Sequence, residues 1–491
     1  MRLLQPDRRF DLAALTLATV LLRLPAYLAE RHLTFDDGVF GASAVAMRAG
    51  GRPFADVFSS QGPLFLPLVW LADGVGLRTL DAPRLLAVTS GVALVVAVYL
   101  AGRLLADRRG ALMAAGLTTT SVSVLGITGP LAADGPALAL ATLGAALALG
   151  WRGGLDTRRV LVLGVVVGAA LSVKSLMLPA VVPVAMVLLA SGRARHVLYG
   201  ASSAIAVHLV VALPWGLADV WDQSYTYHLE VAGERTPLAN LGKVASTLGD
   251  RDLPLVAMAL VAALHVAWRP ARARPAAPTT VGRPDVGRVR WHERVPTSPV
   301  ALLGAWLGAT VVVLTLVDPL WRPHIAQLVP PGALLVASAV TGSLAAHRWC
   351  GRALAVAAVV VVPYHVVHAS SLLAPSPYRG SAAEVVHSLT GLPDGALAIS
   401  DDPGLVWRAG RRTPPDLVDA SVLRIETGRI TAASVAAAAA TDDVCAVAVR
   451  SRQRWGSFED LPERLAAAGY RAVLTDEGSR VLYLKERCAP A

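Results

Sequence analysis

The chain has few charged residues for its length and almost no lysine. Only 16% of its 491 residues are charged, and 54% are hydrophobic. Ordinary soluble domains have about 25% charged residues. Lysine occurs three times among 45 basic residues. This composition excludes an ordinary soluble globular protein and predicts a polytopic membrane protein.

Cysteine is also scarce, with three in the chain. Their spacing supports neither a zinc site nor a thiol nucleophile. Cys350 falls in a predicted inner loop, whereas Cys445 and Cys488 fall near the C-terminus, where a disulfide and two free thiols fit the sequence equally well. No basic patch is interleaved with stacking aromatics, so the net charge of +10 does not indicate a nucleic-acid partner.

Apolar runs of membrane-spanning length fill most of the chain before about residue 373. A helix needs about 17 to 25 residues to cross roughly 30 Å of hydrocarbon. We predict about eleven transmembrane helices, some of them short, at 11-29, 84-102, 111-127, 136-151, 159-173, 175-190, 197-215, 252-268, 299-317, 324-346 and 352-373. The first run lacks a convincing cleavage site, so we interpret it as a retained anchor.

Arginine clusters occur between these runs and orient the chain. The positive-inside rule places the N-terminus and the arginine-rich loops in the cytoplasm. We therefore predict a multi-pass protein of the plasma membrane, with loops 30-83 and 216-251 and the C-terminal region on the outer face. Segment 63-77 is apolar, but a crossing there would reverse every later loop, so we interpret it as an interfacial helix.

Composition divides the chain into four parts. Residues 1-268 form a membrane module, 269-298 a Pro/Ala/Arg-rich linker that we expect to be disordered, and 299-373 further transmembrane helices. Residues 374-491 predict a small α/β extracytoplasmic domain with a helix at 461-468 and strands at 396-400, 444-449, 471-474 and 481-484. The fold class is thus mainly α, with a small α/β domain at the C-terminus.

Acidic residues follow the first span and recur in the next outer loop. Asp36 and Asp37 are adjacent, and Asp134 lies at a turn between two spans. Carboxylates just outside a bilayer suit chemistry on a lipid-borne substrate. The same residues also fit helix caps, because Thr34 to Asp37 precede an apolar helical segment.

Basic residues occur at the same predicted depth. Lys174 lies between two apolar runs, where an ammonium costs about 2.5 to 3.5 kcal/mol unless it reaches an interface or an anion. Snorkelling to headgroups and binding of a polyprenyl phosphate both fit this position. Arg322 and His324 precede Pro330 and Pro331 and are either interface anchors or further phosphate-binding donors.

The order of these motifs resembles the GT-C glycosyltransferases, and most closely the branch (glycosyltransferase family 39-like) with protein O-mannosyltransferases and the lipid A aminoarabinose transferase. The likeness rests on residues 1-346: Asp36-Asp37, Gln61-Gly62-Pro63-Leu64, Asp134, Lys174 and Arg322-Pro323-His324. In that superfamily, an acidic pair, a second acid and a Lys-Pro-Pro-like element serve sugar transfer. Gln61 stands before Pro63 where that element has its basic residue, so Lys174, Arg322 and His324 would have to bind the donor phosphate.

The resemblance implies an inverting hexosyl- or pentosyltransferase. It would move a sugar from a polyprenyl-phosphate donor to an envelope glycan, lipid or protein acceptor. Asp36 and Asp37 are the expected catalytic residues, with Asp36 as base, while Asp37 and Asp134 orient the acceptor or hold a divalent cation. Two carboxylates suit Mg²⁺ or Mn²⁺, but the resemblance includes metal-independent members. The expected partners are this donor, the acceptor and membrane lipids.

Two other functions fit a polytopic membrane protein. A transporter or flippase of lipid-linked sugars would use the aspartates as ion-coupling groups. However, the ionisable residues lie at the predicted outer boundary, whereas transporter sites lie near the bilayer midplane. A non-catalytic anchor that displays the C-terminal domain to envelope partners would leave four residues without a shared purpose: Asp36, Asp37, Asp134 and Lys174.

Overall fold

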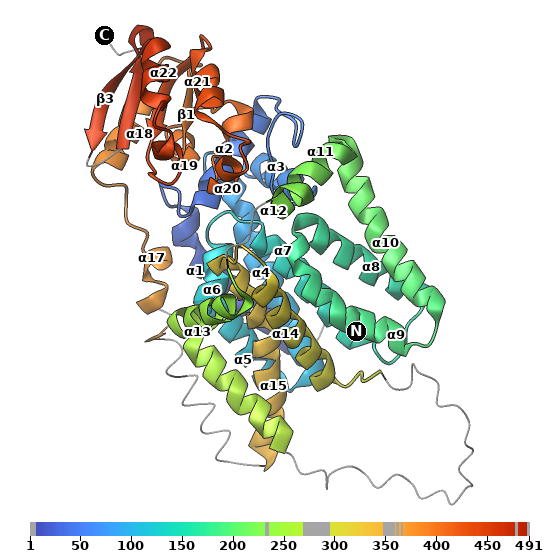
Figure 1. The fold of residues 1–491 in the computed structure, drawn as a ribbon. Coiled ribbons are helices and arrows are strands. Elements are labelled where there is room, and N and C mark those ends of the chain that lie inside the picture. Colours follow the sequence, from blue (N-terminus) through green and yellow to red (C-terminus); the bar gives the residue numbers. More distant parts are fainter. Residues whose placement is uncertain are drawn as a thin grey trace, which may run out of the picture.

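The structure is a computed structural model that describes residues 6–230, 235–268, 295–346, 359, 363–364, 367–476 and 480–488. A bundle of helices forms the larger part, and a small sheet domain lies at one end of it (Figure 1). The mainly helical fold with a small C-terminal sheet is confirmed. Most of the predicted linker and most of the predicted span 352-373 lie outside the described residues.

The helices of the bundle coincide with the apolar runs of the sequence. Within the described residues, five helices are long and apolar enough to cross a membrane, or six if one bent pair forms a single span. The five are α1 (Pro6–Tyr27), α4 (Leu85–Leu105), α7 (Asp134–Trp151), α10 (Ala194–Ala212) and α14 (Pro299–Leu316). The predicted number of eleven stays a prediction.

Three predicted spans are interrupted or extended. The run 111-127 is broken by a 62° bend between α5 (Arg108–Thr120) and α6 (Val122–Thr128). The run 175-190 begins as a 3-10 helix and continues as α9 (Val181–Ala190). The predicted span 252-268 is part of a longer helix, α13 (Pro237–Trp268), which starts well before residue 252. The helical backbone angles of α13 are interrupted at Asp252.

The helices pack closely because small residues line their contacts. α4 packs against α1, α5 and α7, and α7 packs against α8 (Thr157–Val173). α8 in turn packs on α10, and a side chain on Gly168 would approach the Ala204 carbonyl oxygen to 2.5 Å. Small residues allow such close approach between membrane helices. A further helix, α15 (Val329–Ala346), packs against α5 and α13.

The segment 30-83, predicted to be the first outer loop and called so below, contains two helices, α2 (Phe35–Arg48) and α3 (Phe65–Val75). α3 falls within the predicted interfacial segment 63-77, so its helical conformation is confirmed and its position at the membrane boundary stays a prediction. The predicted loop 216-251 is mostly helical as well, with α11 (Leu217–Trp221), α12 (Tyr227–Glu230) and the start of α13.

The C-terminal domain is built on a four-stranded mixed sheet. Its strands have the order β1-β2-β4-β3; β1 and β2 are parallel, and the other pairs are antiparallel. The strands are β1 (Leu397–Ser400), β2 (Val444–Val449), β3 (Tyr470–Asp476) and β4 (Arg480–Lys485). The helices around it are α18 (Ser381–Thr390), α19 (Pro403–Arg408), α20 (Val422–Glu426), α21 (Ala432–Ala440) and α22 (Leu461–Ala467).

Two details of this domain were predicted from the sequence. All four predicted strands are present, and α22 ends before Gly469, which adopts a positive φ of 82°. Cys445 and Cys488 form a disulfide with a Cα–Cα distance of 5.6 Å. The disulfide was one of the two alternatives that the sequence left open, and it links β2 to the end of the described chain.

The C-terminal domain is seated directly on the first outer loop through α19 and α2, which lie beside each other in Figure 1. Glycines make this contact close: a side chain on Gly38 would meet the backbone of Gly404 at 2.6 Å, and one on Gly41 would overlap the buried ring of Trp407. The C-terminal domain therefore packs against α2, the helix that carries Asp36 and Asp37.

Candidate active site

Helix α2 begins where the first outer loop leaves α1, and its first turn carries both aspartates. Thr34 caps the helix, with its hydroxyl oxygen accepting a hydrogen bond from the amide of Asp37 at 3.2 Å. Acidic side chains in a first turn are stabilised by the helix dipole. The cap interpretation therefore holds for Thr34, and it leaves the two carboxylates available for other contacts. Adjacent helical residues point about 100° apart, so these contacts differ.

The Asp37 carboxylate is buried and fully bonded. Arg84 donates to it from Nη2 (2.6 Å) and Nε (3.1 Å), and the amides of Leu33 (2.9 Å) and Leu131 (2.8 Å) donate as well. Asp37 and Arg84 side chains are both 0% exposed. A carboxylate has about four acceptor positions, and protein donors occupy them. Asp37 ties α2 to the turns before α4 and α7.

Asp36 points elsewhere and is half-buried. In the described part of the chain its carboxylate has no hydrogen-bond or ion-pair partner. Withdrawal from water raises the pKa of Asp36 to about 6; the charge of Lys174 opposes this rise, and those of Asp134 and Asp419 add to it. A carboxylate with such a pKa is mostly ionised at neutral pH and can still accept a proton.

Asp134, at the start of α7, and Lys174, at the end of α8, form an ion pair. Lys174 Nζ lies 2.7 Å from Asp134 Oδ2, and the side chains are 14% and 3% exposed. Lys174 stands at the break between α8 and the following 3-10 helix, in an extended conformation. The structure thus gives Lys174 a protein partner that neither sequence interpretation included. Asp134 Oδ1 is buried and has no hydrogen-bond partner among the described residues.

The element Gln61 to Leu64 is held against the same break. The amides of Gly62 and Leu64 donate to the carbonyls of Val173 (3.1 Å) and Ser172 (2.9 Å). A side chain on Gly62 would approach the Ser172 carbonyl oxygen to 2.2 Å, so only glycine fits there. The loop therefore lies beside Lys174.

The side chains of this element contact their own loop. Gln61 Nε2 donates to the Ser60 hydroxyl at 3.1 Å, and the Gln61 carbonyl accepts from Ser224 at 2.7 Å. Pro63 is buried. The structure gives the Gln61 side chain a role within the loop, and the positive charge next to it comes from Lys174.

The two predicted donors near Pro330 are in different environments. His324 is buried and is close enough to Lys174 and Asp134 for their charges to act on it. Arg322 is exposed, and its charge acts on Lys243 and Arg251. The structure therefore brings His324 to the ion pair, whereas Arg322 belongs to a separate basic group.

Two residues of the site were not predicted from the sequence. Asp419 of the C-terminal domain is buried, and its charge acts on Asp36. His228 of α12 donates from Nε2 to the carbonyl of Ser60 at 2.8 Å. Asp419 precedes α20 in Leu417-Val418-Asp419-Ala420-Ser421, which has no catalytic signature. The docking of the C-terminal domain brings it to the site, through the packing of α19 on α2 and through contacts such as that between the hydroxyls of Ser421 and Tyr227 at 3.0 Å.

The described residues do not supply a three-ligand metal site. No group of three or more His, Cys, Asp or Glu side chains is arranged in this part of the chain to hold a metal ion. Asp134 already binds the ammonium of Lys174, which provides positive charge where a divalent cation would. We therefore derive no step through Mg²⁺ or Mn²⁺.

Comparison with solved structures identifies the fold. No protein-family model and no curated relative matches this chain. The structure of ArnT from Cupriavidus metallidurans bound to undecaprenyl phosphate superposes with a TM-score of 0.61 at 15% identity, covering 98% of this chain and 99% of that one. ArnT is a membrane glycosyltransferase of the GT-C superfamily, and the two chains share a fold over nearly their whole length.

Two further GT-C structures support this result. The oligosaccharyltransferase of Archaeoglobus fulgidus, in complex with Zn and sulfate, gives a TM-score of 0.58 at 13% identity over 97% of this chain and 73% of its own. The arabinofuranosyltransferase AftD from Mycobacteria gives 0.52 at 16% identity over 97% and 41%. The predicted resemblance is confirmed, and it extends beyond residue 346 to nearly the whole chain. These neighbours are multi-pass membrane proteins, and the helices of this chain suit membrane insertion.

Proposed function

We propose that this protein is an inverting glycosyltransferase that moves a sugar from a polyprenyl-phosphate donor to an acceptor hydroxyl. The observation that carries the proposal is the unpaired, half-buried carboxylate of Asp36, whose charge environment includes the Lys174–Asp134 pair. A base and a cation in one site are what such a transfer requires. The ArnT structure contains undecaprenyl phosphate, and one archaeal oligosaccharyltransferase structure contains a dolichol-phosphate, which supports this donor class.

In the proposed reaction, Asp36 acts on the acceptor and Lys174 acts on the leaving phosphate. The acceptor oxygen attacks the anomeric carbon from the side opposite the phosphate, a new C–O bond forms, and the C–O bond to the phosphate breaks. Asp36 takes the acceptor proton, and the polyprenyl phosphate leaves with the bonding electrons. Lysine has three N–H donors, so Lys174 can keep Asp134 and also donate to the phosphate.

The other polar residues have supporting roles in this proposal. Asp134 Oδ1, which lacks a partner among the described residues, accepts a hydrogen bond from a sugar or acceptor hydroxyl. His324 adds a donor beside Lys174. Asp37 holds α2 in place through Arg84 instead of contacting substrate, which changes the catalytic role that the resemblance implied for it. Gln61 and Pro63 shape the loop against Lys174.

We also propose the topology that the arginine clusters predict. The N-terminus is cytoplasmic, about eleven helices cross the plasma membrane, and the C-terminal domain is extracytoplasmic. The Cys445–Cys488 disulfide supports an outer, oxidising location for that domain. The module boundaries at residues 268, 298 and 373 belong to the same proposal, as does an envelope glycan, lipid or protein as acceptor.

The test uses purified full-length protein with a short-chain polyprenyl-phosphate hexose or pentose of known anomeric configuration. We expect stoichiometric release of polyprenyl phosphate and a product whose anomeric configuration is inverted, as read by NMR. Retention of configuration would contradict direct displacement. Movement of the intact lipid-linked sugar across proteoliposomes, without cleavage of the donor, would instead establish a flippase.

A further inference from the structure

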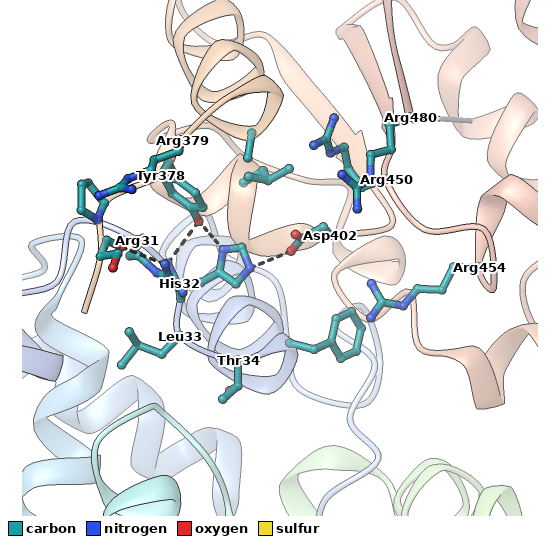
Figure 2. Close-up of a pocket in the computed structure, with 15 residues that line it drawn as sticks. Arg31, His32, Leu33, Thr34, Tyr378, Arg379, Asp402, Arg450, Arg454 and Arg480 are labelled. Atoms are coloured by element: carbon teal, nitrogen blue, oxygen red, sulfur yellow. Dashed lines mark hydrogen bonds and ion pairs between the residues drawn. The ribbon is translucent and has the colours of Figure 1, made fainter. Parts of the chain in front are cut away.

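A cavity lies between the first outer loop and the C-terminal domain. It has a volume of about 720 Å³. Its walls come from residues 31–35 on one side and from segments 376–382, 402–405 and 450–454 with Arg480 on the other. Figure 2 shows Arg450, Arg454 and Arg480 reaching into it from the C-terminal domain. A cavity of this size accommodates a small-molecule group, since ligand pockets span about 300 to 1,000 Å³.

The charge of this cavity is strongly positive. Five arginines line it, and Asp402 is the one acidic side chain among the described residues that line it. The five are Arg31, Arg379, Arg450, Arg454 and Arg480. Guanidinium groups bind phosphate through two parallel hydrogen bonds and are weakly hydrated. An anionic ligand would relieve the repulsion among like charges gathered around one space.

The loop that carries two of these arginines is fixed in place. The buried Asp401 carboxylate accepts hydrogen bonds from the amides of Arg450 (2.7 Å) and Ser451 (2.9 Å). The Arg450 guanidinium donates to the Ser381 hydroxyl at 2.9 Å, and that of Arg454 stacks over the Phe35 ring at 3.9 Å. Restraint of this kind lowers the entropy lost when a ligand binds.

The remaining polar contacts join the two walls. His32 Nε2 lies 3.2 Å from Asp402 Oδ1, and the other ring nitrogen contacts the Tyr378 hydroxyl. Arg31 Nη1 donates to the Ser376 carbonyl at 2.8 Å. These contacts connect the segment that leaves α1 to the segment that enters the C-terminal domain. The cavity therefore depends on both parts of the chain being docked.

The position of the cavity relates it to the proposed base. Thr34 and Phe35 line it, and Asp36 is the next residue along α2. The cavity therefore borders the first turn of α2, which also carries Asp36. The donor phosphate, by contrast, belongs with Lys174.

We propose that this arginine-lined cavity binds a phosphate ester carried by the acceptor, and so places the acceptor hydroxyl near Asp36. The inference rests on the proposed function for the role of the ligand, and on the cavity alone for its binding. The phosphate is either part of a lipid headgroup or part of an acceptor that is not lipid-borne. Both present the same oxyanion to the arginines.

The first experiment measures binding of inorganic pyrophosphate to the full-length protein in neutral detergent by calorimetry. Arg450→Gln with Arg480→Gln should weaken binding at least about tenfold, because each charge-assisted hydrogen bond contributes substantially. Arg452→Gln is the matched control, since this exposed arginine belongs to the same loop and does not line the cavity. Equal affinity of the double variant and the control would overturn the proposal.

A single variant tests the same site in case the double variant does not fold. Arg480 is exposed at the start of β4, so Arg480→Gln alone should unfold at the same temperature as Arg452→Gln. It should still lose several-fold in affinity for pyrophosphate. Full pyrophosphate affinity in this folded single variant would also overturn the proposal.

The second experiment separates the source of the phosphate and the proposed function. In nanodiscs, phosphatidylglycerol should weaken pyrophosphate binding relative to phosphatidylcholine alone if the ligand is a lipid headgroup. The two lipids should give the same pyrophosphate affinity if the acceptor is not lipid-borne. Donor hydrolysis to free sugar should be the same in the double variant and the control, whereas the acceptor KM should rise. If hydrolysis is absent in every protein while pyrophosphate binding follows the arginines, the proposed function fails and the anion site stands.

Discussion

Asp36 and Asp37 are adjacent, and their substitution by asparagine should have opposite consequences. Asp37→Asn removes the charge that neutralises the fully buried guanidinium of Arg84. Breaking a buried ion pair by removing one partner costs about 3 to 5 kcal/mol. Arg84 keeps the carbonyl of Ala29 at 2.7 Å and Asp81 at 3.3 Å. We therefore expect the lower end, about 3 kcal/mol.

Asp36→Asn should leave stability unchanged or slightly increased. Its pKa in the folded protein is about 6, above the ordinary value of 3.8, so folding favours the protonated form. Above pH 6 the ionised side chain therefore opposes folding, and a neutral amide removes that opposition. Thr34, not Asp36, caps α2, so no cap is lost.

The assay is thermal unfolding of purified variants in detergent at pH 7.5. Unfolding entropy is about 2.1 cal/mol/K per residue near 60 °C, which for 491 residues is about 1 kcal/mol/K. A loss of 3 kcal/mol then lowers Tm by roughly 3 °C if the chain unfolds as one unit, and by more if the outer part unfolds first. Asp56→Asn, an exposed change in the same loop, should shift Tm by less than about 1 °C.

A double variant checks the cause of the destabilisation. Asp37→Leu with Arg84→Met removes both charges and should recover much of the lost Tm, because no uncompensated charge stays buried. An Asp37→Asn protein as stable as wild type would refute the structural role of the pair. So would an Asp36→Asn protein that is destabilised as much as Asp37→Asn.

Three further outcomes follow from the site. Because Asp36 must be deprotonated to act as base, kcat/KM should fall about tenfold per pH unit below pH 6 and level off above it; a profile flat down to pH 4.5 would contradict its pKa of about 6. Lys174→Ala should raise the donor KM and lower kcat by about tenfold or more each, since an ammonium facing the phosphate acts in both ground and transition states; unchanged values would restore the snorkelling interpretation. Gly62→Ala should lower kcat without changing the fold of the C-terminal domain, because the added carbon would displace the loop from Ser172; wild-type turnover would show that the loop does not position Lys174.

The sequence predicted much of the fold because its signals are local. The strands at 444-449 and 481-484 and the helix before Gly469 follow from short hydrophobic patterns and a turn residue. The break in the predicted span 111-127 was missed because Ser121 caps a new helix inside an apolar run, with its hydroxyl accepting a hydrogen bond from the Val124 amide at 3.2 Å. Hydropathy alone does not detect such a break.

The site was predicted in part, for a different reason. Asp36, Asp134, Lys174 and His324 are unusual for their surroundings in the sequence, and they are brought together by the fold. The partners of these residues depend on tertiary contacts: Arg84 binds Asp37 across 47 positions, and Asp419 arrives with a separate domain. No local pattern distinguishes the fully hydrogen-bonded carboxylate of Asp37 from the unpaired, half-buried one of Asp36 next to it.

The most direct test of the central claim is sugar transfer by Asp36→Asn, measured together with donor binding in the same preparation. General base catalysis contributes about 10²- to 10⁴-fold, so transfer should fall at least about a hundredfold while the protein binds the short-chain polyprenyl-phosphate sugar with wild-type affinity. Transfer within a few-fold of wild type, in protein of equal Tm and donor affinity, would contradict the assignment of Asp36 as the base.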